Sequence, residues 1–171
     1  MSQKLAPPRL VAVDTNVALD FSAGVEDVCD AIATIRTRIS SVELWLPPTT
    51  VQELAHLATV ARSLELRQSA RRMLRQHRAL GFRLVTFIPL GFDQVERISQ
   101  CLRSSNLLPR DEVNDSLILA EAAALGCTLL TSSDAHLRSV DHAKLKHELG
   151  RFDLAAPIIA TPREIVRMFF W

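Results

Sequence analysis

Residues 10–16 read LVAVDTN, and this stretch decides the fold because an apolar run passes directly into polar residues. The run at 10–13 contains two valines and ends abruptly, which predicts a short buried strand. Asp14 then lies where the strand ends, with the Thr15 hydroxyl and the Asn16 amide beside it. A buried strand that ends in polar side chains predicts a functional sheet edge.

Similar apolar runs recur along the chain and predict further strands at residues 42–46, 82–88, 128–131 and 157–160. Sequence with helical periodicity fills the spaces between them. Connections of this length accommodate crossover helices, so the pattern predicts an α/β protein with a mostly parallel five-stranded sheet covered on both faces. The carboxyl ends of the strands should then meet at one edge.

The chain has 171 residues, of which 48% are hydrophobic, and it contains no repeat or long Pro/Gly/Ser-rich linker. We therefore expect one domain spanning residues 1–171. Its three cysteines show no paired spacing, which favours a reducing, cytoplasmic environment. The amino terminus lacks an apolar signal region, and the apolar stretch 117–130 is short and interrupted by Glu121, so we expect no membrane association.

Four acidic residues lie where strand-like runs end or helices begin: Asp14, Glu53, Asp115 and Asp134. The predicted topology gathers them at one sheet edge. Clustered carboxylates repel one another unless a divalent cation neutralises them. Their arrangement therefore favours a metal-dependent phosphodiesterase site.

Each acid also has an ordinary structural explanation. Asp14 and Asp134 are suitable helix N-caps, and Asp115 is a first-turn acid that complements the helix dipole. Glu53 follows Thr50 at the spacing of a capping box, and for Glu53 alone that interpretation is favoured. The four together favour a metal site, because oxygen-bearing side chains flank three of the acids and hard cations prefer oxygen ligands: Thr15, Asn16, Asn114 and Ser132.

Four segments carry a family resemblance: VDTN at 13–16, VQEL at 51–54, NDSLILA at 114–120 and LTSSD at 130–134. With them the sequence resembles PIN-domain ribonucleases of the kind found as bacterial VapC toxins, over nearly the whole chain. The resemblance implies a three-layer αβα, Rossmann-like fold and cleavage of single-stranded RNA that depends on Mg²⁺ or Mn²⁺. It also implies frequent homodimers and, for VapC members, inhibition by an antitoxin protein.

By position, the resemblance assigns catalysis and metal binding to the four acids, with the flanking hydroxyl and amide side chains in support. Two other functions stay open at this point. One is a non-catalytic PIN-like scaffold that binds RNA or protein, since a fold does not guarantee chemistry. The other is a housekeeping RNA-processing nuclease.

Between positions 61 and 78 the chain has six arginines and one glutamate, on what the pattern predicts to be one helix. Arg67, Arg71, Arg75 and Arg78 recur at spacings of four, four and three, which places them in one stripe. We call these four residues the arginine stripe. It is equally consistent with a solvated helix face and with a surface that binds RNA phosphate.

Three histidines follow Asp134 in the sequence: His136, His142 and His147. Their spacing matches no common zinc-ligand pattern. We therefore expect surface histidines rather than metal ligands.

Overall fold

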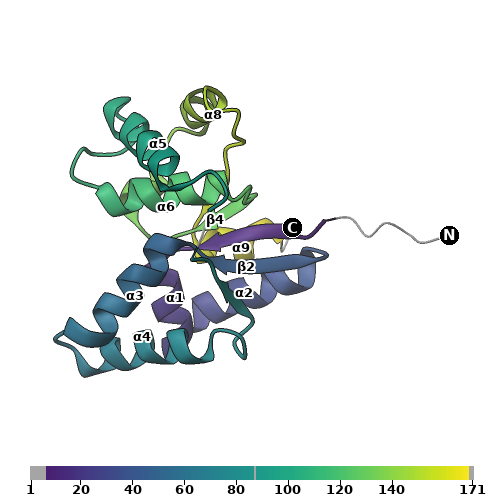
Figure 1. The fold of residues 1–171 in the computed structure, drawn as a ribbon. Helices are drawn as coiled ribbons and strands as arrows, with labels where there is room; N and C mark the ends of the chain where they lie inside the picture. The colour runs from purple at the N-terminus through teal and green to yellow at the C-terminus, as the bar shows by residue number, and fades with distance from the viewer. Residues whose placement is uncertain (1–6, 87, 170–171) are drawn as a thin grey trace.

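Five short strands form one all-parallel sheet in the order β3-β2-β1-β4-β5 (Figure 1). The computed structural model describes residues 7–86 and 88–169. The strands are β1 (Arg9–Val13), β2 (Val42–Leu46), β3 (Phe82–Leu84), β4 (Leu129–Thr131) and β5 (Ile158–Ala160). The predicted α/β class and five-stranded parallel sheet are confirmed, and the sheet proves to be parallel throughout.

The third strand is shorter than predicted. It ends at Leu84, after which the Val85 amide makes one more bond to the Leu46 carbonyl, at 3.0 Å. Ile88 is buried against the helices of one face instead of extending the sheet. Position 87, inside the predicted strand, lies outside the described residues. The apolar side chains of Val85 and Ile88 thus reflect burial rather than strand formation.

Helices cover both faces of the sheet, which gives the three-layer arrangement seen in Figure 1. One face carries α1 (Thr15–Ala23), α2 (Glu26–Arg38), α3 (Pro48–Val60), α4 (Leu64–Gln76) and α9 (Pro162–Phe169). The other face carries α5 (Phe92–Ser104), α6 (Val113–Ala124), α7 (Ala135–Arg138) and α8 (His142–Gly150). Within the described ranges, no helix combines the length and apolarity needed to cross a bilayer.

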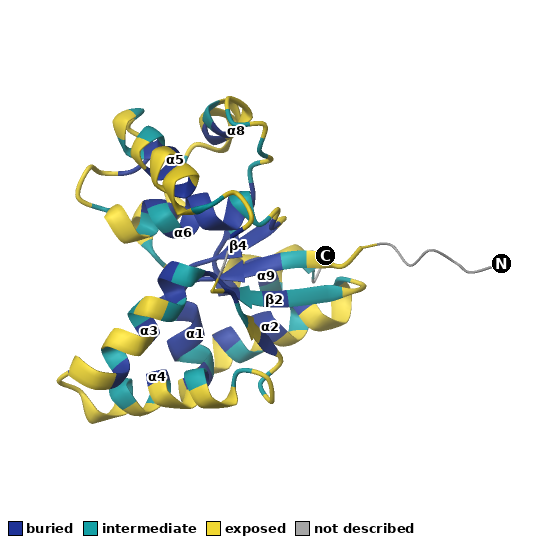
Figure 2. Ribbon diagram, in the orientation of Figure 1, coloured by how far each residue is buried: buried dark blue, intermediate teal, exposed yellow. Residues whose placement is uncertain are grey.

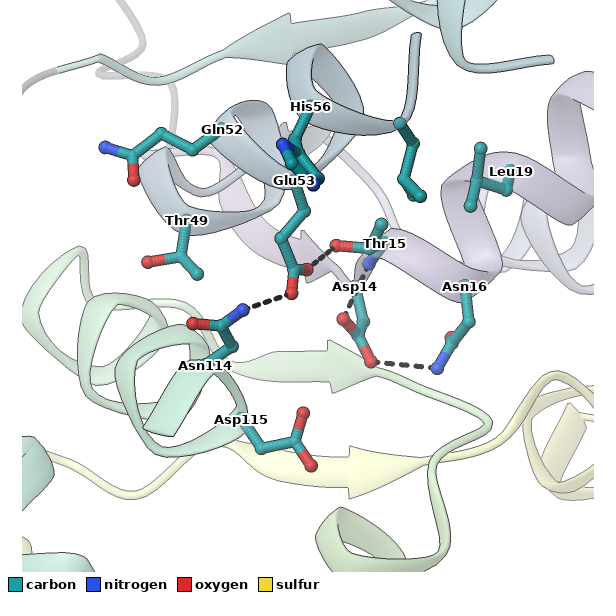
Figure 3. A pocket seen from close by; sticks show the side chains of 11 residues that line it. Asp14, Thr15, Asn16, Leu19, Thr49, Gln52, Glu53, His56, Asn114 and Asp115 are labelled. Carbon is teal, nitrogen blue, oxygen red and sulfur yellow. Dashed lines mark hydrogen bonds between the residues drawn. The ribbon is translucent and has the colours of Figure 1, made fainter. Parts of the chain in front are cut away.

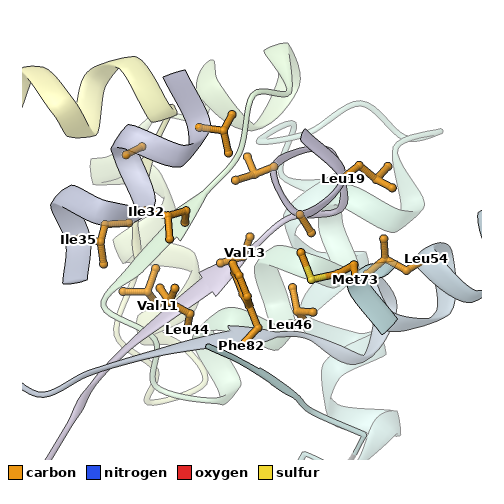
Figure 4. Close-up of a cluster of buried hydrophobic side chains, with 14 of the residues drawn as sticks. Val11, Val13, Leu19, Ile32, Ile35, Leu44, Leu46, Leu54, Met73 and Phe82 are labelled. Atoms are coloured by element: carbon orange, nitrogen blue, oxygen red, sulfur yellow. The ribbon is translucent and has the colours of Figure 1, made fainter. Parts of the chain in front are cut away.

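The alternation of side chains along the strands produces two hydrophobic cores. In β1, Val11 and Val13 point to the core under α1, α2 and α4, where they meet Ile32 and Met73 (Figure 4). Ala12 points to the other core, under α5 and α6. Residues 11–13 of β1 and all of β4, at the centre of the sheet, are buried on both faces (Figure 2), as is typical of parallel sheets.

The strand order fixes where a site can form. The chain proceeds outward from β1 through β2 to β3, then returns to build β4 and β5 on the opposite side of β1. The connections after β1 and β4 therefore diverge, and open α/β sheets bind ligands at such a switch point. The Asp14 amide donates to the Thr131 carbonyl at 3.0 Å, so both strand ends meet at this position.

Candidate metal centre

Asp14 occupies the switch point and is nearly fully buried, with 3% of its surface exposed. One oxygen, Oδ1, accepts from the Thr15 amide at 2.6 Å, which caps α1. The other, Oδ2, accepts from the Ser132 hydroxyl at 2.5 Å and the Asn16 side-chain amide at 3.1 Å. Burial raises the pKa of Asp14 to about 6, although the bonds from Ser132 and Thr15 oppose the shift.

Asp115 lies in the first turn of α6, next to Asp14 in the cavity (Figure 3). Its Oδ2 atom is buried and has no hydrogen-bond partner within the described ranges. Burial, followed by the charges of Asp134 and Asp14, raises the pKa of Asp115 to about 7. Buried polar atoms normally have a partner, so the lone pairs of this oxygen suit it to bind a cation.

Glu53 points toward Asp14 from α3 and is held from both sides (Figure 3). The Thr15 hydroxyl donates to Oε2, and the Asn114 side-chain amide donates to Oε1 at 2.6 Å. The capping-box interpretation is wrong because α3 begins at Pro48, so Thr50 is already inside the helix. The Glu53 carboxylate is therefore free to face the cavity.

Asp134 caps the short helix α7 and also affects the other acids. Its Oδ1 accepts from the amides of His136 and Leu137, at 2.7 and 3.2 Å. It does not line the cavity that contains Asp14, but its charge contributes to the raised pKa values of Asp14 and Asp115. Asp134 thus affects Asp14 by its charge, and it affects Asp115 both by its charge and by a contact between the two carboxyl groups that raises the pKa of Asp115 further.

A cavity of about 550 Å³ opens between α1, α3 and the start of α6. Three of the four predicted acids line it, together with the predicted supporting residues Thr15, Asn16 and Asn114. Ser132 lies behind Asp14 and holds it. The remaining lining residues are Leu19, Thr49, Gln52, His56 and Leu57. Since none of the described lysines and arginines lines the cavity, a bound phosphate needs a positive charge from elsewhere.

The acids converge without forming a closed cage. Within residues 7–86 and 88–169, no three His, Cys, Asp or Glu side chains lie close enough to hold one ion. Mg²⁺ usually takes only one or two carboxylates and keeps several waters. Asp14 and the unpartnered oxygen of Asp115 fit that requirement, and Mn²⁺ accepts the same oxygen ligands.

Glu121 is a buried acid that the sequence reasoning did not assign. It lies in the third turn of α6 with 2% of its surface exposed. Its carboxylate accepts from the Thr49 amide, at 3.0 and 3.2 Å, and from the Thr49 hydroxyl at 2.7 Å. Burial raises the pKa of Glu121 to about 7, against the effect of these bonds. A lone acid inside an apolar helix was the available signal, because buried charges require partners.

The arginine stripe lies apart from the cavity. The predicted single helix at 61–78 is wrong at both ends, because Ser63 caps α4, which ends at Gln76, and Arg78 lies in the following turn. The Arg71 side chain donates to the Ala58 carbonyl at 2.9 Å, so it supports the end of α3. Arg67 is half-buried, whereas Arg75 and Arg78 are exposed.

The three histidines are exposed, as predicted. His136 Nε2 lies 3.3 Å from a carboxylate oxygen of Glu112, and this contact involves no cavity residue. None of the three belongs to a metal-binding group within the described part of the chain.

Comparison with known proteins agrees with the architecture. The family model described as PIN domain matches residues 11–143. The crystal structure of VapBC2 from Rickettsia felis, bound to a DNA fragment from their promoter, superposes with a TM-score of 0.60. The match has 12% sequence identity and covers 89% of this chain and 98% of that chain, so it reflects the fold alone. No curated protein matches the sequence.

Proposed function

The chain belongs to the PIN domain family, and from this premise we propose that it is a metal-dependent endoribonuclease that cleaves single-stranded RNA. PIN domains are typically metal-dependent nucleases. We place the reaction in the cavity that Asp14, Glu53 and Asp115 line. The resemblance to VapC-type ribonucleases supports RNA as the substrate.

The observation that carries the proposal is the buried, unpartnered Oδ2 of Asp115 beside the buried carboxylate of Asp14. Both groups have raised pKa values, so the protein alone stabilises their charged forms poorly. If Asp115 had only a structural role, a hydrogen-bond donor would be expected to face its Oδ2 atom. A divalent cation compensates both charges at once.

In this proposal Asp14 and Asp115 hold the cation, and Ser132 and Asn16 fix the Asp14 carboxylate. When bound there, the cation lowers the pKa of a water and stabilises charge on the phosphoryl oxygens. Glu53, held by Thr15 and Asn114, orients or deprotonates the attacking water. Asp134 adds negative charge at the edge of the site and so favours cation binding.

We propose that the arginine stripe attracts the RNA backbone without reading its sequence. Arg75 and Arg78 are the best placed of the four because Arg67 is half-buried and Arg71, although exposed, bonds to the end of α3. Phosphate contacts position a nucleic acid but carry no base information. Arg71 has a structural bond to α3, so its replacement should also weaken the packing of α4.

We further propose that an antitoxin protein inhibits this chain and that the chain forms homodimers. The structural similarity to VapBC2 supports an antitoxin partner. The frequency of homodimers among PIN-domain ribonucleases supports self-association. Expression should arrest growth, and co-expression of an adjacent reading frame should relieve the arrest. Light scattering of the purified chain measures its oligomeric state. RNA cleavage without growth arrest would favour a housekeeping processing nuclease.

The central experiment measures cleavage of labelled single-stranded RNA, duplex RNA and matched single-stranded DNA with Mg²⁺, with Mn²⁺ and with chelator. We expect cleavage of single-stranded RNA that requires metal and is lost in Asp14→Asn. Asp93→Asn is the matched control, since Asp93 is an exposed first-turn acid on α5. RNA binding without cleavage by the wild type, under all metal conditions, would identify a non-catalytic scaffold instead.

A further inference from the structure

We propose that Glu121 is a positioning residue for the acidic cavity: from α6 it holds the first turn of α3, and thereby sets where Glu53 stands. This inference rests on the function proposed above and adds a residue that lines neither the cavity nor the cation position. Two hydrogen-bonded pairs of residues connect α3 with α6.

The two pairs lie along the contact between these helices. Thr49 of α3 bonds to Glu121 in the buried interior, and Glu53 of α3 bonds to Asn114 at the cavity. Residues four apart on a helix share one face, so Thr49 and Glu53 face α6 together. The buried pair therefore fixes the direction in which the Glu53 side chain leaves α3.

A carboxylate from another helix is needed because α3 cannot cap itself. Pro47 is its N-cap residue and makes no side-chain cap bond, and Pro48 is its first residue. The first amides of a helix lack intrahelical partners and carry partial positive charge. Glu121 supplies both the acceptor and the negative charge at this end, so the position of α3 depends on α6 rather than on local sequence.

Helix α6 also offers a matched control on its opposite side. The hydroxyls of Ser116 on α6 and Ser99 on α5 are 2.7 Å apart, and both residues are buried. This bond connects α6 to a helix that contributes nothing to the cavity. Ser99→Ala therefore removes a buried polar contact of α6 without touching α3.

Glu53 is not a cation ligand in this proposal, but its negative charge faces the cavity and favours a cation there, so replacement of Glu121 should weaken metal binding by displacing that charge. In Glu121→Leu the first turn of α3 loses its acceptor, and Glu53 loses its fixed position opposite Asp14. We expect affinity for Mn²⁺ to fall by about tenfold or more. This range is typical of residues that do not touch the metal but orient the groups around it. Glu121→Gln keeps one acceptor oxygen and the same shape, so it should restore affinity to within about threefold of wild type.

The test titrates Mn²⁺ alone into the full chain by calorimetry, for wild type, Glu121→Leu, Glu121→Gln, Ser99→Ala and Asp14→Asn, at a temperature where all are folded. A second readout needs no metal: the side-chain amide resonance of Asn114, which reports its bond to Glu53. We expect Glu121→Leu to shift this resonance and Ser99→Ala to leave it unchanged.

The outcomes separate the two proposals. If Asp14→Asn weakens Mn²⁺ binding but Glu121→Leu leaves both affinity and the Asn114 resonance unchanged, Glu121 is structural only and this inference is wrong. If wild type and Asp14→Asn bind Mn²⁺ equally, the proposed metal site fails. The Asn114 resonance still decides in that case, since an unshifted resonance in Glu121→Leu overturns the positioning role by itself.

Discussion

Helix α6 carries two acids, Asp115 and Glu121, whose pKa values are raised alike but whose hydrogen-bond partners differ. Burial raises the pKa of Asp115 and that of Glu121 to about 7. Glu121 accepts bonds from the amide and hydroxyl of Thr49, whereas Oδ2 of Asp115 has no partner in the described part of the chain. A raised pKa thus marks burial, and only the partners distinguish a group that holds structure from one that binds a ligand.

The neighbours of the two acids explain the difference. Glu121 faces the start of α3, where backbone amides supply donors and positive potential. Asp115 faces Asp14 and Asp134, which repel it. The first environment compensates a charge within the protein, and the second, within the described residues, does not.

The largest expected effect is the loss of RNA cleavage when Asp115, rather than Glu121, is replaced. Asp115→Asn should reduce metal-dependent RNA cleavage by at least about 100-fold, because it removes a proposed cation ligand. Its free energy of unfolding without metal should stay equal or rise, since repulsion within the cluster is relieved. Cleavage rates and urea denaturation of the same preparation measure both quantities. Full activity in Asp115→Asn would mean that Asp115, like Glu121, does not bind the cation.

The next largest effect is a difference in stability between variants at Glu121 and at Asp115. Glu121→Leu should lower the free energy of unfolding by about 1–3 kcal/mol, because the Thr49 amide loses its acceptor in a buried site. Asp115→Asn provides the comparison, with no loss expected. Equal stability of wild type and Glu121→Leu in urea would mean that water or a neighbouring group replaces the carboxylate.

A third effect concerns pH. Asp14, Asp115 and Glu121 have folded-state pKa values of about 6, 7 and 7, above the ordinary values of 3.8 for Asp and 4.5 for Glu. The native state therefore binds more protons than the unfolded state between about pH 5 and 7, so metal-free stability falls as pH rises through this window. We expect the melting temperature to be lower at pH 8 than at pH 5 by at least about 2–4 °C.

Added Mg²⁺ sharpens this third test. At pH 8 it should restore part of the lost stability in wild type, because a cation binds the ionised acids of the native state only. Asp115→Asn should lose most of that restoration, and Glu121→Gln should keep it. A melting temperature that rises steadily from pH 5 to 8 without metal would contradict the sign of the pKa shifts.

The smallest effect concerns the arginine stripe, which lies outside the acidic cavity. Replacing Arg75 and Arg78 by alanine should weaken RNA binding across sequences and flatten its dependence on salt, since fewer counterions are released. Cleavage-site preference should stay the same. Fluorescence anisotropy at several salt concentrations measures the slope, and an unchanged slope would leave these arginines as an ordinary solvated surface.

Much of the fold was predictable because local patterns and topology agree. Short apolar runs gave the strands, and the long connections between them required parallel crossovers. The third strand was overestimated because residues beyond Leu84 are apolar for another reason, the burial of Ile88 under the helices. The ends of α4 were misplaced because arginine spacing alone does not reveal the cap at Ser63.

The candidate site was predictable to a different degree at each residue. Asp14 follows a valine run that leaves few alternatives for its position. Glu53 was ambiguous because its spacing from Thr50 imitates a capping box, and the true start of α3 decided against that interpretation. Glu121 was visible as a lone acid in an apolar helix, but its role was not, since its partner Thr49 lies far away in sequence.

The sequence by itself determined the alternation of strands and helices, the residues at which β1, β2, β4 and β5 end, and the family, because these depend on short-range patterns of apolar and polar side chains. Only the tertiary structure decided which acids have partners. Hydrogen-bond partners such as Thr49 for Glu121 and Asn114 for Glu53 come from segments distant in the chain. Two carboxylates on one helix therefore differ in whether they receive hydrogen-bond donors, depending on what folding places against them.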